Sequence, residues 1–297
     1  MRTILSCLFL LLCCCSQSIR AAIIPSWTTP IVPFQISDNL YYVGSKDLGS
    51  YLVVTPKGNI LIDANLDSSA PQIRASVEKL GFHWADTRIL LNSQAHYDHV
   101  GGAAQVVRET HAKNMVMEGD VKVMETGGRT DFLSPSTNLL PYAPVHVDRV
   151  LHDGDTVTLG GVTLVAHKTA GHTRGCTTWT MRSHLPGEPA GTIRNIVIVG
   201  GVSFWSEYHF VATPGHPVSY PGIAQDFEHT FSALRALPCD VFLGAHGSYF
   251  DMLTKLKGYP QEGPRVFIDA AGYQEFVADA QETFKKELSK QGAGAAR

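Results

Sequence analysis

Charged residues are scarce in this sequence, and neither sign is in marked excess. Only 17% of the 297 residues are charged, 44% are hydrophobic, and the formal net charge is −3. A disordered chain would have few apolar residues and a large net charge. A protein that binds nucleic acid through bulk charge would be basic. The composition excludes both classes and is typical of a globular protein that buries a sizeable core.

Long apolar runs are also absent, except at the N-terminus. There Arg2 precedes an apolar stretch over residues 4–15, and small residues follow it. This stretch is too short to span a bilayer comfortably, and the order of its parts predicts a secretory signal peptide over residues 1–21. We therefore expect a periplasmic or secreted protein without a membrane span, and the run Cys13–Cys15 leaves a lipid-anchored form open.

Cysteine becomes rare once that segment is set aside. Removing residues 1–21 takes away four of the six cysteines, together with Arg2 and Arg20 but no acidic residue, so the formal charge moves from −3 to −5. Cys176 and Cys239 remain. An exported chain could join them in a disulfide, and two unpaired thiols fit the sequence equally well.

The sequence has no low-complexity linker and no close internal repeat, which favours one domain over residues 22–297. Three β-branched and aromatic segments separated by turns predict a β-meander, namely residues 40–43, 50–54 and 59–63. Ser69 is the expected cap of a helix with Pro71 in its first turn and apolar residues at helical spacing.

Strands and helices alternate along the rest of the chain. Further strands are expected at residues 88–91, 115–117, 156–159, 162–166, 177–181, 196–199 and 241–245. Further helices are expected at residues 102–111, 120–126, 223–237 and 273–290, and residues 127–146 form a long loop. Two such strand-then-helix halves predict an α/β protein with two packed sheets and helices outside them.

Four potential metal ligands lie within six residues directly after the buried strand 88–91. They are Gln94, His96, Asp98 and His99. In an extended segment every second side chain points to the same side, so Gln94, His96 and Asp98 would face one side together. His99 would turn to complete a second site. Zinc accepts both imidazole nitrogen and carboxylate oxygen. A single histidine is usually structural, but this density of ligands indicates a metal site.

Two more histidines follow expected strands. His172 lies in the glycine-flanked segment 171–175, and His246 comes directly after the strand 241–245. Loops at strand ends are where an α/β scaffold carries its functional residues. Either histidine alone would be interpreted as a turn residue, but beside the first cluster both are candidate ligands. The remaining histidines show no ligand spacing, and we expect them to be structural or exposed.

With these motifs the sequence resembles the metallo-β-lactamase superfamily over essentially all of residues 22–297. The resemblance rests on residues 59–63, 94–102, 153–161, 171–175 and 244–246. It implies an αβ/βα four-layer sandwich that holds one or two zinc ions between its sheets. The usual first motif is H-x-H-x-D-H, and Gln94 stands where the first histidine is normally found. The chain is most similar to class B β-lactamases of subclass three, including their Gln-bearing members.

The resemblance also implies how the ligands divide. Gln94, His96 and His172 would bind the first zinc, and Asp98, His99 and His246 the second. The second set contains no cysteine, as in subclass three. In related thioesterases and lactonases an Asp bridges both metals at the position of Gly201, which has no carboxylate to offer. Gly201 also departs from the serine typical of subclass three, and Ser203 is the candidate for holding a substrate carboxylate.

The expected reaction is hydrolysis of the β-lactam amide bond of a small-molecule antibiotic, which would confer antibiotic resistance. Zinc brings the pKa of bound water to about 7, so a metal-bound hydroxide could attack the carbonyl while Asp98 orients it. The serine-hydrolase motif G-x-S-x-G does not occur in the sequence. The alternatives are a thioester, lactone or phosphoester hydrolase on the same fold, and a non-catalytic zinc-binding protein.

Overall fold

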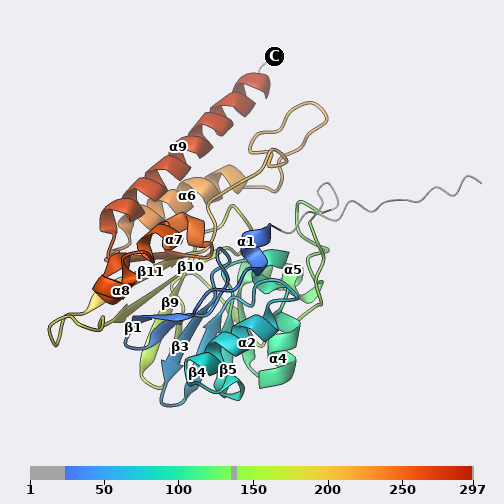
Figure 1. Cartoon of the computed structure of the whole chain (residues 1–297). Coiled ribbons are helices and arrows are strands. Elements are labelled where there is room, and N and C mark those ends of the chain that lie inside the picture. The colour runs from blue at the N-terminus through green and yellow to red at the C-terminus, as the bar shows by residue number, and fades with distance from the viewer. Residues whose placement is uncertain (1–23, 135–138, 296–297) are drawn as a thin grey trace, which may run out of the picture.

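Two mixed β-sheets pack face to face, and helices cover the outer side of each. The computed structural model describes residues 24–134 and 139–295. The signal peptide expected over residues 1–21 therefore lies outside the described residues. In Figure 1 the helices α2 and α4 lie beside the first sheet, and α6 and α9 lie along the second. This is the expected α/β four-layer sandwich.

The first sheet has seven strands in the order β1 to β7. Its strands are β1 (Phe34–Ser37), β2 (Leu40–Tyr42), β3 (Tyr51–Thr55), β4 (Gly58–Ile62), β5 (Thr87–Leu91), β6 (Lys113–Met117) and β7 (Arg149–Leu151). The pairs from β1 to β4 are antiparallel, which confirms the expected meander. The pairs from β4 to β7 are parallel, so the carboxyl ends of β4, β5 and β6 meet at one edge.

The second sheet has five strands in the order β12-β11-β10-β9-β8. They are β8 (Thr156–Leu159), β9 (Val162–Lys168), β10 (Thr177–Ser183), β11 (Arg194–Val199) and β12 (Val241–Gly244). The strands β11 and β12 run parallel, and α6 (Ile223–Ala236) is the crossover that a parallel pair requires. The terminal helix α9 (Ala270–Ala295) is longer than expected and packs on α6 through stacked rings of Phe227 and Phe284.

Parallel strands of the first sheet are joined by α2 (Ala70–Lys79) and α4 (Ala103–Thr110). The remaining helices are short: α1 (Pro25–Thr28), η1 (Trp84–Asp86), α3 (Tyr97–Val100), η2 (Glu118–Asp120), α5 (Val121–Glu125), η3 (Gly247–Phe250), α7 (Met252–Lys255), α8 (Tyr259–Glu262) and η4 (Gly263–Phe267). Ser69 does precede α2, but its side chain makes no capping hydrogen bond. The long loop is present on both sides of the undescribed residues 135–138.

Two hydrogen bonds join the sheets at the edge where the ligand-bearing loops emerge. The Tyr51 hydroxyl donates to the Gly244 carbonyl at 2.6 Å, and the Trp179 indole N–H donates to the Asn92 carbonyl at 3.2 Å. All four residues are buried. Buried donors and acceptors of this kind are costly to leave unpaired, so these bonds fix the end of β12 against β3 and the end of β5 against β10.

The described cysteines, Cys176 and Cys239, are both free thiols. Burial raises the pKa of each to about 12, so neither is a ready nucleophile at neutral pH. Among the residues that the structure describes, no helix has the length and apolarity needed to cross a bilayer.

Candidate metal centre

The first ligand cluster lies at the carboxyl end of β5. The chain bends after β5, has an extended backbone at His96 and then turns into α3, where the amide of His99 bonds to the carbonyl of His96 at 3.0 Å. Asp98 therefore does not continue the strand-like spacing that was expected to place it on the same side as Gln94 and His96. Asp98 and His99 instead project from one helical turn, and this turn directs both of them to the same group of ligands.

Three of the expected ligands, Asp98, His99 and His246, converge at one point, and we call them the Asp98 group. Oδ2 of Asp98 lies 3.3 Å from Nε2 of His99 and 3.5 Å from Nε2 of His246. One ligand atom of each lies within 4.8 Å of the other two. Ligand atoms about 2.0–2.1 Å from a tetrahedral zinc lie about 3.3–3.4 Å apart. The spacing of the Asp98 group therefore fits zinc.

The other three expected ligands, Gln94, His96 and His172, form what we call the Gln94 group. Nδ1 of His96 lies 3.1 Å from Nε2 of His172, and the two rings meet edge to face. The Gln94 side chain is buried, and its Oε1 has no hydrogen-bond partner. A buried amide oxygen without a partner is unfavourable, and a bound cation would relieve this cost.

Every imidazole of both groups has an acceptor beside its other nitrogen. The pairs are His96 Nε2 with Asp131 Oδ2 at 3.6 Å, His99 Nδ1 with Asp63 Oδ2 at 3.3 Å, His246 Nδ1 with Asp47 Oδ2 at 3.2 Å, and His172 Nδ1 with the Ser203 carbonyl at 2.7 Å. In the tautomers that place the proton of each neutral ring on the nitrogen beside its acceptor, the remaining lone pairs face one another across the site. Lone pairs at such distances repel unless a proton or a cation lies between them.

Ionisation in the Asp98 group follows from the same contacts. Burial by itself would lower the pKa of His99, but the carboxylates of Asp98 and Asp63 outweigh it and raise that pKa to about 10. Burial opposes ionisation of Asp98 as well, yet His99 and His246 hold its pKa well below the ordinary value. In the metal-free protein, the Asp98 group therefore holds a proton on His99, among the same side chains that would bind a cation.

The Gln94 group is electrostatically different. Burial, reinforced by His96, lowers the pKa of His172 to about 3, so this ring stays neutral at physiological pH and keeps its lone pair for a metal. Gln94 brings no charge to the group. The two groups therefore differ in charge, because only the Asp98 group contains a carboxylate.

Asp120 holds the two ligand-bearing loops together. Its buried carboxylate accepts hydrogen bonds from the Ala95 amide at 3.0 Å, the Thr173 hydroxyl at 2.7 Å and the Gly175 amide at 2.8 Å. Ala95 lies between Gln94 and His96, and Thr173 follows His172. Burial raises the pKa of Asp120 to about 6. Asp120, which belongs to neither ligand-bearing loop, thus sets the position of His172 relative to the segment from Gln94 to His99.

A cavity of about 350 Å³ opens onto both groups and is walled by two tryptophans. Its lining includes Asp98, His172 and His246 from the two groups. The ring of Trp205 lies 5.5 Å from the rings of His96 and His172, and that of Trp27 lies 5.9 Å from His246. Ile24, Asp47, Ser203, Ser248 and Tyr249 complete the wall. A larger cavity of about 620 Å³ along β9 and β10 shares none of these residues.

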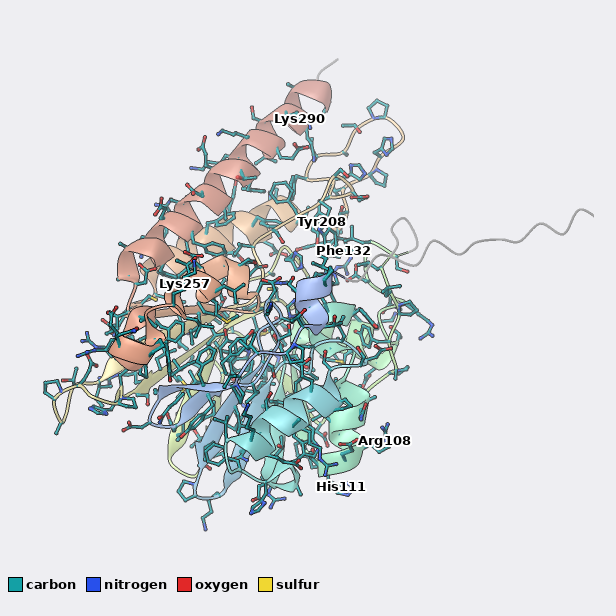
Figure 2. The ribbon with its side chains drawn as sticks, viewed as in Figure 1. Arg108, His111, Phe132, Tyr208, Lys257 and Lys290 are labelled. Atoms are coloured by element: carbon teal, nitrogen blue, oxygen red, sulfur yellow. The ribbon has the colours of Figure 1, made fainter. Side chains whose placement is uncertain are left out.

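His172 is confined from several sides. Tyr208, which lies close to Phe132 in Figure 2 with ring centres 5.4 Å apart, donates its hydroxyl proton to the His172 carbonyl at 2.6 Å. Gly201 lies against the imidazole itself: a Cβ there would sit 2.8 Å from Cδ2 of His172. The glycine that replaces the bridging Asp therefore occupies a position where the ring leaves no room for a side chain.

Sequence reasoning missed Trp27, Asp47, Asp120 and Asp131 as parts of the site. None belongs to a ligand motif, and Asp47 and Asp131 lie in loops. Their relation to the ligands depends on contacts between segments far apart in the chain, such as Asp47 with His246. Ser203, the candidate for holding a substrate carboxylate, lines the cavity.

The sequence and structure have clear relatives. A family model described as the metallo-β-lactamase superfamily matches residues 50–246. The native FEZ-1 metallo-β-lactamase from Legionella gormanii is 43% identical with a TM-score of 0.83, covering 90% of this chain and 98% of that one. LRA-12, a class B3 di-zinc metallo-β-lactamase from an Alaskan soil metagenome, is 36% identical with a TM-score of 0.79, covering 90% and 98%.

Curated proteins match more distantly. A probable metallo-hydrolase of Burkholderia pseudomallei is 30% identical over 131 residues, which are 41% of this chain. A hydroxyacylglutathione hydrolase of Rhodospirillum rubrum is 29% identical over 141 residues, which are 47% of this chain. In each case the match spans 42% of the relative's own length.

Proposed function

The chain belongs to the metallo-β-lactamase superfamily, and from this we propose that it is a zinc-dependent β-lactamase. The substrate class is supported by the likeness to β-lactamases that extends over 90% of the chain. The observation that carries the metal requirement is the pair of ligand groups, each with ligand atoms 3.1–3.5 Å apart, on one cavity.

Zinc is the cofactor that these residues fit, with one or two ions per chain. Gln94, His96 and His172 would hold one ion, and Asp98, His99 and His246 the other. When bound, zinc supplies a Lewis acid and lowers the pKa of water to about 7. The buried, unpartnered Oε1 of Gln94 and the spacing of the Asp98 group support this assignment.

The residues of the chain have distinct parts in the proposed reaction. Water adds across the amide bond of the ring, so the carbonyl carbon gains an oxygen, the nitrogen leaves with a proton, and a carboxylate and an amine result. Asp98, kept ionised and lining the cavity, would accept a hydrogen bond from the attacking water and orient it. Trp27 and Trp205 would cover apolar parts of the substrate and exclude bulk water, and Ser203 would bind its carboxylate.

A second candidate is a thioester hydrolase, which the match to a hydroxyacylglutathione hydrolase brings into consideration. Enzymes of that kind were expected to carry a bridging Asp where this chain has Gly201. The imidazole of His172 lies too close to Gly201 for a Cβ, so an Asp could not be introduced there without moving His172. A serine at this position would meet the same contact, so it is the missing carboxylate of Gly201 that favours the β-lactamase proposal over a thioester, lactone or phosphoester hydrolase.

A substrate panel tests the proposal. Purified protein would be stripped of metal, reloaded with zinc and assayed on a carbapenem, a cephalosporin, an acyl thioester and a lactone. We expect β-lactam hydrolysis that disappears with the metal and returns with zinc. Full activity in verified metal-free protein would contradict the zinc requirement, and faster turnover of the thioester or lactone would contradict the substrate class.

We also propose that the protein is exported, on the basis of the N-terminal sequence pattern. Fractionation of expressing cells, followed by N-terminal sequencing of the accumulated protein, tests this. A protein found in the cytoplasm with residues 1–21 still attached would contradict it.

A further inference from the structure

Asp47 lies in the loop between β2 and β3 and receives three N–H groups from distant parts of the chain. Its Oδ2 accepts from the Trp27 indole at 3.1 Å and from His246 Nδ1 at 3.2 Å, and its Oδ1 accepts from the Ser248 amide at 2.9 Å. The side chain is only 18% exposed. Both carboxylate oxygens are therefore used, and every partner is a donor.

This arrangement fixes the imidazole of His246. A carboxylate can only accept hydrogen bonds, so the proton of the neutral ring must be on Nδ1. Nε2 is then the nitrogen with the free lone pair, and it is the one that lies 3.5 Å from Oδ2 of Asp98. The contact with Asp47 also prevents the ring from rotating away from the Asp98 group.

The N-terminal helix α1 supplies one of the three donors and is itself held to the loop that carries Asp47. The amide of Lys46 donates to the carbonyl of Thr29 at 2.9 Å, and the Ser45 hydroxyl donates to the carbonyl of Ser26 at 3.1 Å. The residues on either side of Trp27, Ser26 and Thr29, are thus both hydrogen-bonded to the loop that carries Asp47.

We propose that Asp47 is a positioning residue for the metal held by the Asp98 group, and that Trp27 sets the position of Asp47. The inference rests on the proposed zinc site. It extends that site by a chain of contacts from α1 through Asp47 to His246, and none of the ligand motifs contains Trp27 or Asp47. Outer carboxylates of this kind typically change metal affinity by about 10–100-fold when they are removed.

The substitution Asp47→Asn tests this with little change in size. The amide has one accepting and one donating end, so it cannot accept from donors on both sides, and it carries no charge. Asp148→Asn is the matched control. Asp148 is 22% exposed and also accepts from a side chain and a backbone amide, Lys113 and Asn114, but it lies away from the ligands.

Zinc affinity, measured by competition with a chelator, and thermal unfolding of the metal-free proteins are the two readouts. We expect Asp47→Asn to bind zinc about 10–100-fold more weakly, Asp148→Asn to match the parent, and Trp27→Phe to show a smaller loss. In a His246→Ala background, Asp47→Asn should have little further effect on zinc affinity, because the imidazole through which Asp47 is proposed to act is gone.

The inference is overturned if Asp47→Asn keeps the parental zinc affinity. It is also overturned if the loss is equally large in Asp148→Asn or in the His246→Ala background, because either result would make the effect a general one on folding. A parent protein that binds no zinc would overturn the proposed function as well. Parental zinc binding that Asp47→Asn leaves unchanged would overturn this inference alone.

Discussion

Replacement of Gly201 by alanine tests how tightly His172 is confined. The added Cβ would lie 2.8 Å from Cδ2, 3.0 Å from Cγ and 3.3 Å from Cβ of His172, whereas carbon atoms pack best at about 3.5–4.0 Å. The imidazole cannot move away freely, because it donates to the Ser203 carbonyl at 2.7 Å and lies beside the rings of Trp205 and Tyr208. Either the overlap persists or that hydrogen bond breaks.

The expected cost follows from these two outcomes. Overpacking of a close-packed site costs about 1–3 kcal/mol, and a lost hydrogen bond costs about 1 kcal/mol. At about 2–4 °C for each kcal/mol in a domain of this size, the Tm of the metal-free protein should fall by about 2–12 °C. If the ring moves instead, the Tm changes less and the affinity of the Gln94 group for zinc falls.

Thermal unfolding of the metal-free protein and a zinc titration together distinguish these outcomes. Gly292→Ala in α9 is the control, because a Cβ there meets no atom within 4 Å. Alanine in a helix is favoured over glycine by about 1 kcal/mol, so the control should not be destabilised. A Gly201→Ala protein with the parental Tm and the parental zinc affinity would show that His172 has room to spare, and the reasoning would be wrong.

Three further predictions concern the ligands themselves. Gln94→His should tighten zinc binding by the Gln94 group about tenfold, or about 1.4 kcal/mol, because imidazole is a better zinc ligand than a neutral amide oxygen. Identical two-step zinc titrations of the parent and the variant would contradict this. Asp98→Ala and His246→Ala should each reduce kcat at least about a hundredfold, and a near-parental rate in either variant would exclude that residue from the mechanism. The raised pKa of His99, about 10 in the metal-free protein, gives stability that is fully present below about pH 6.5 and is lost as the pH rises through 10. Zinc must displace this proton, so affinity measured by chelator competition should rise about tenfold per pH unit between pH 6 and 8, and a pH-independent affinity would refute the assignment.

The sequence by itself determined which residues could bind a metal. The run from Gln94 to His99 follows a buried strand, and His172 and His246 also follow strands, so local patterns of burial and turn residues predicted all six candidates. The β-meander and the two-sheet architecture could be predicted for the same reason. The short edge strands β1 and β7 could not, because β7 has three residues of which two are exposed, and such a segment has no clear alternation.

The tertiary structure alone decided how these residues are oriented. Asp47 and His246 are 199 positions apart, and only the junction between the N-terminal segment, the first sheet and the loop after β12 brings them together. The turn into α3 sent Asp98 and His99 to the same group, which strand alternation had not predicted. Gly201 was noticed in the sequence for the carboxylate it lacks, but the imidazole of His172 packed against it explains why no side chain fits. Local sequence determines burial and turns, whereas distances between ligands depend on how two sheets pack, and that packing is the sum of many contacts between residues far apart in the chain.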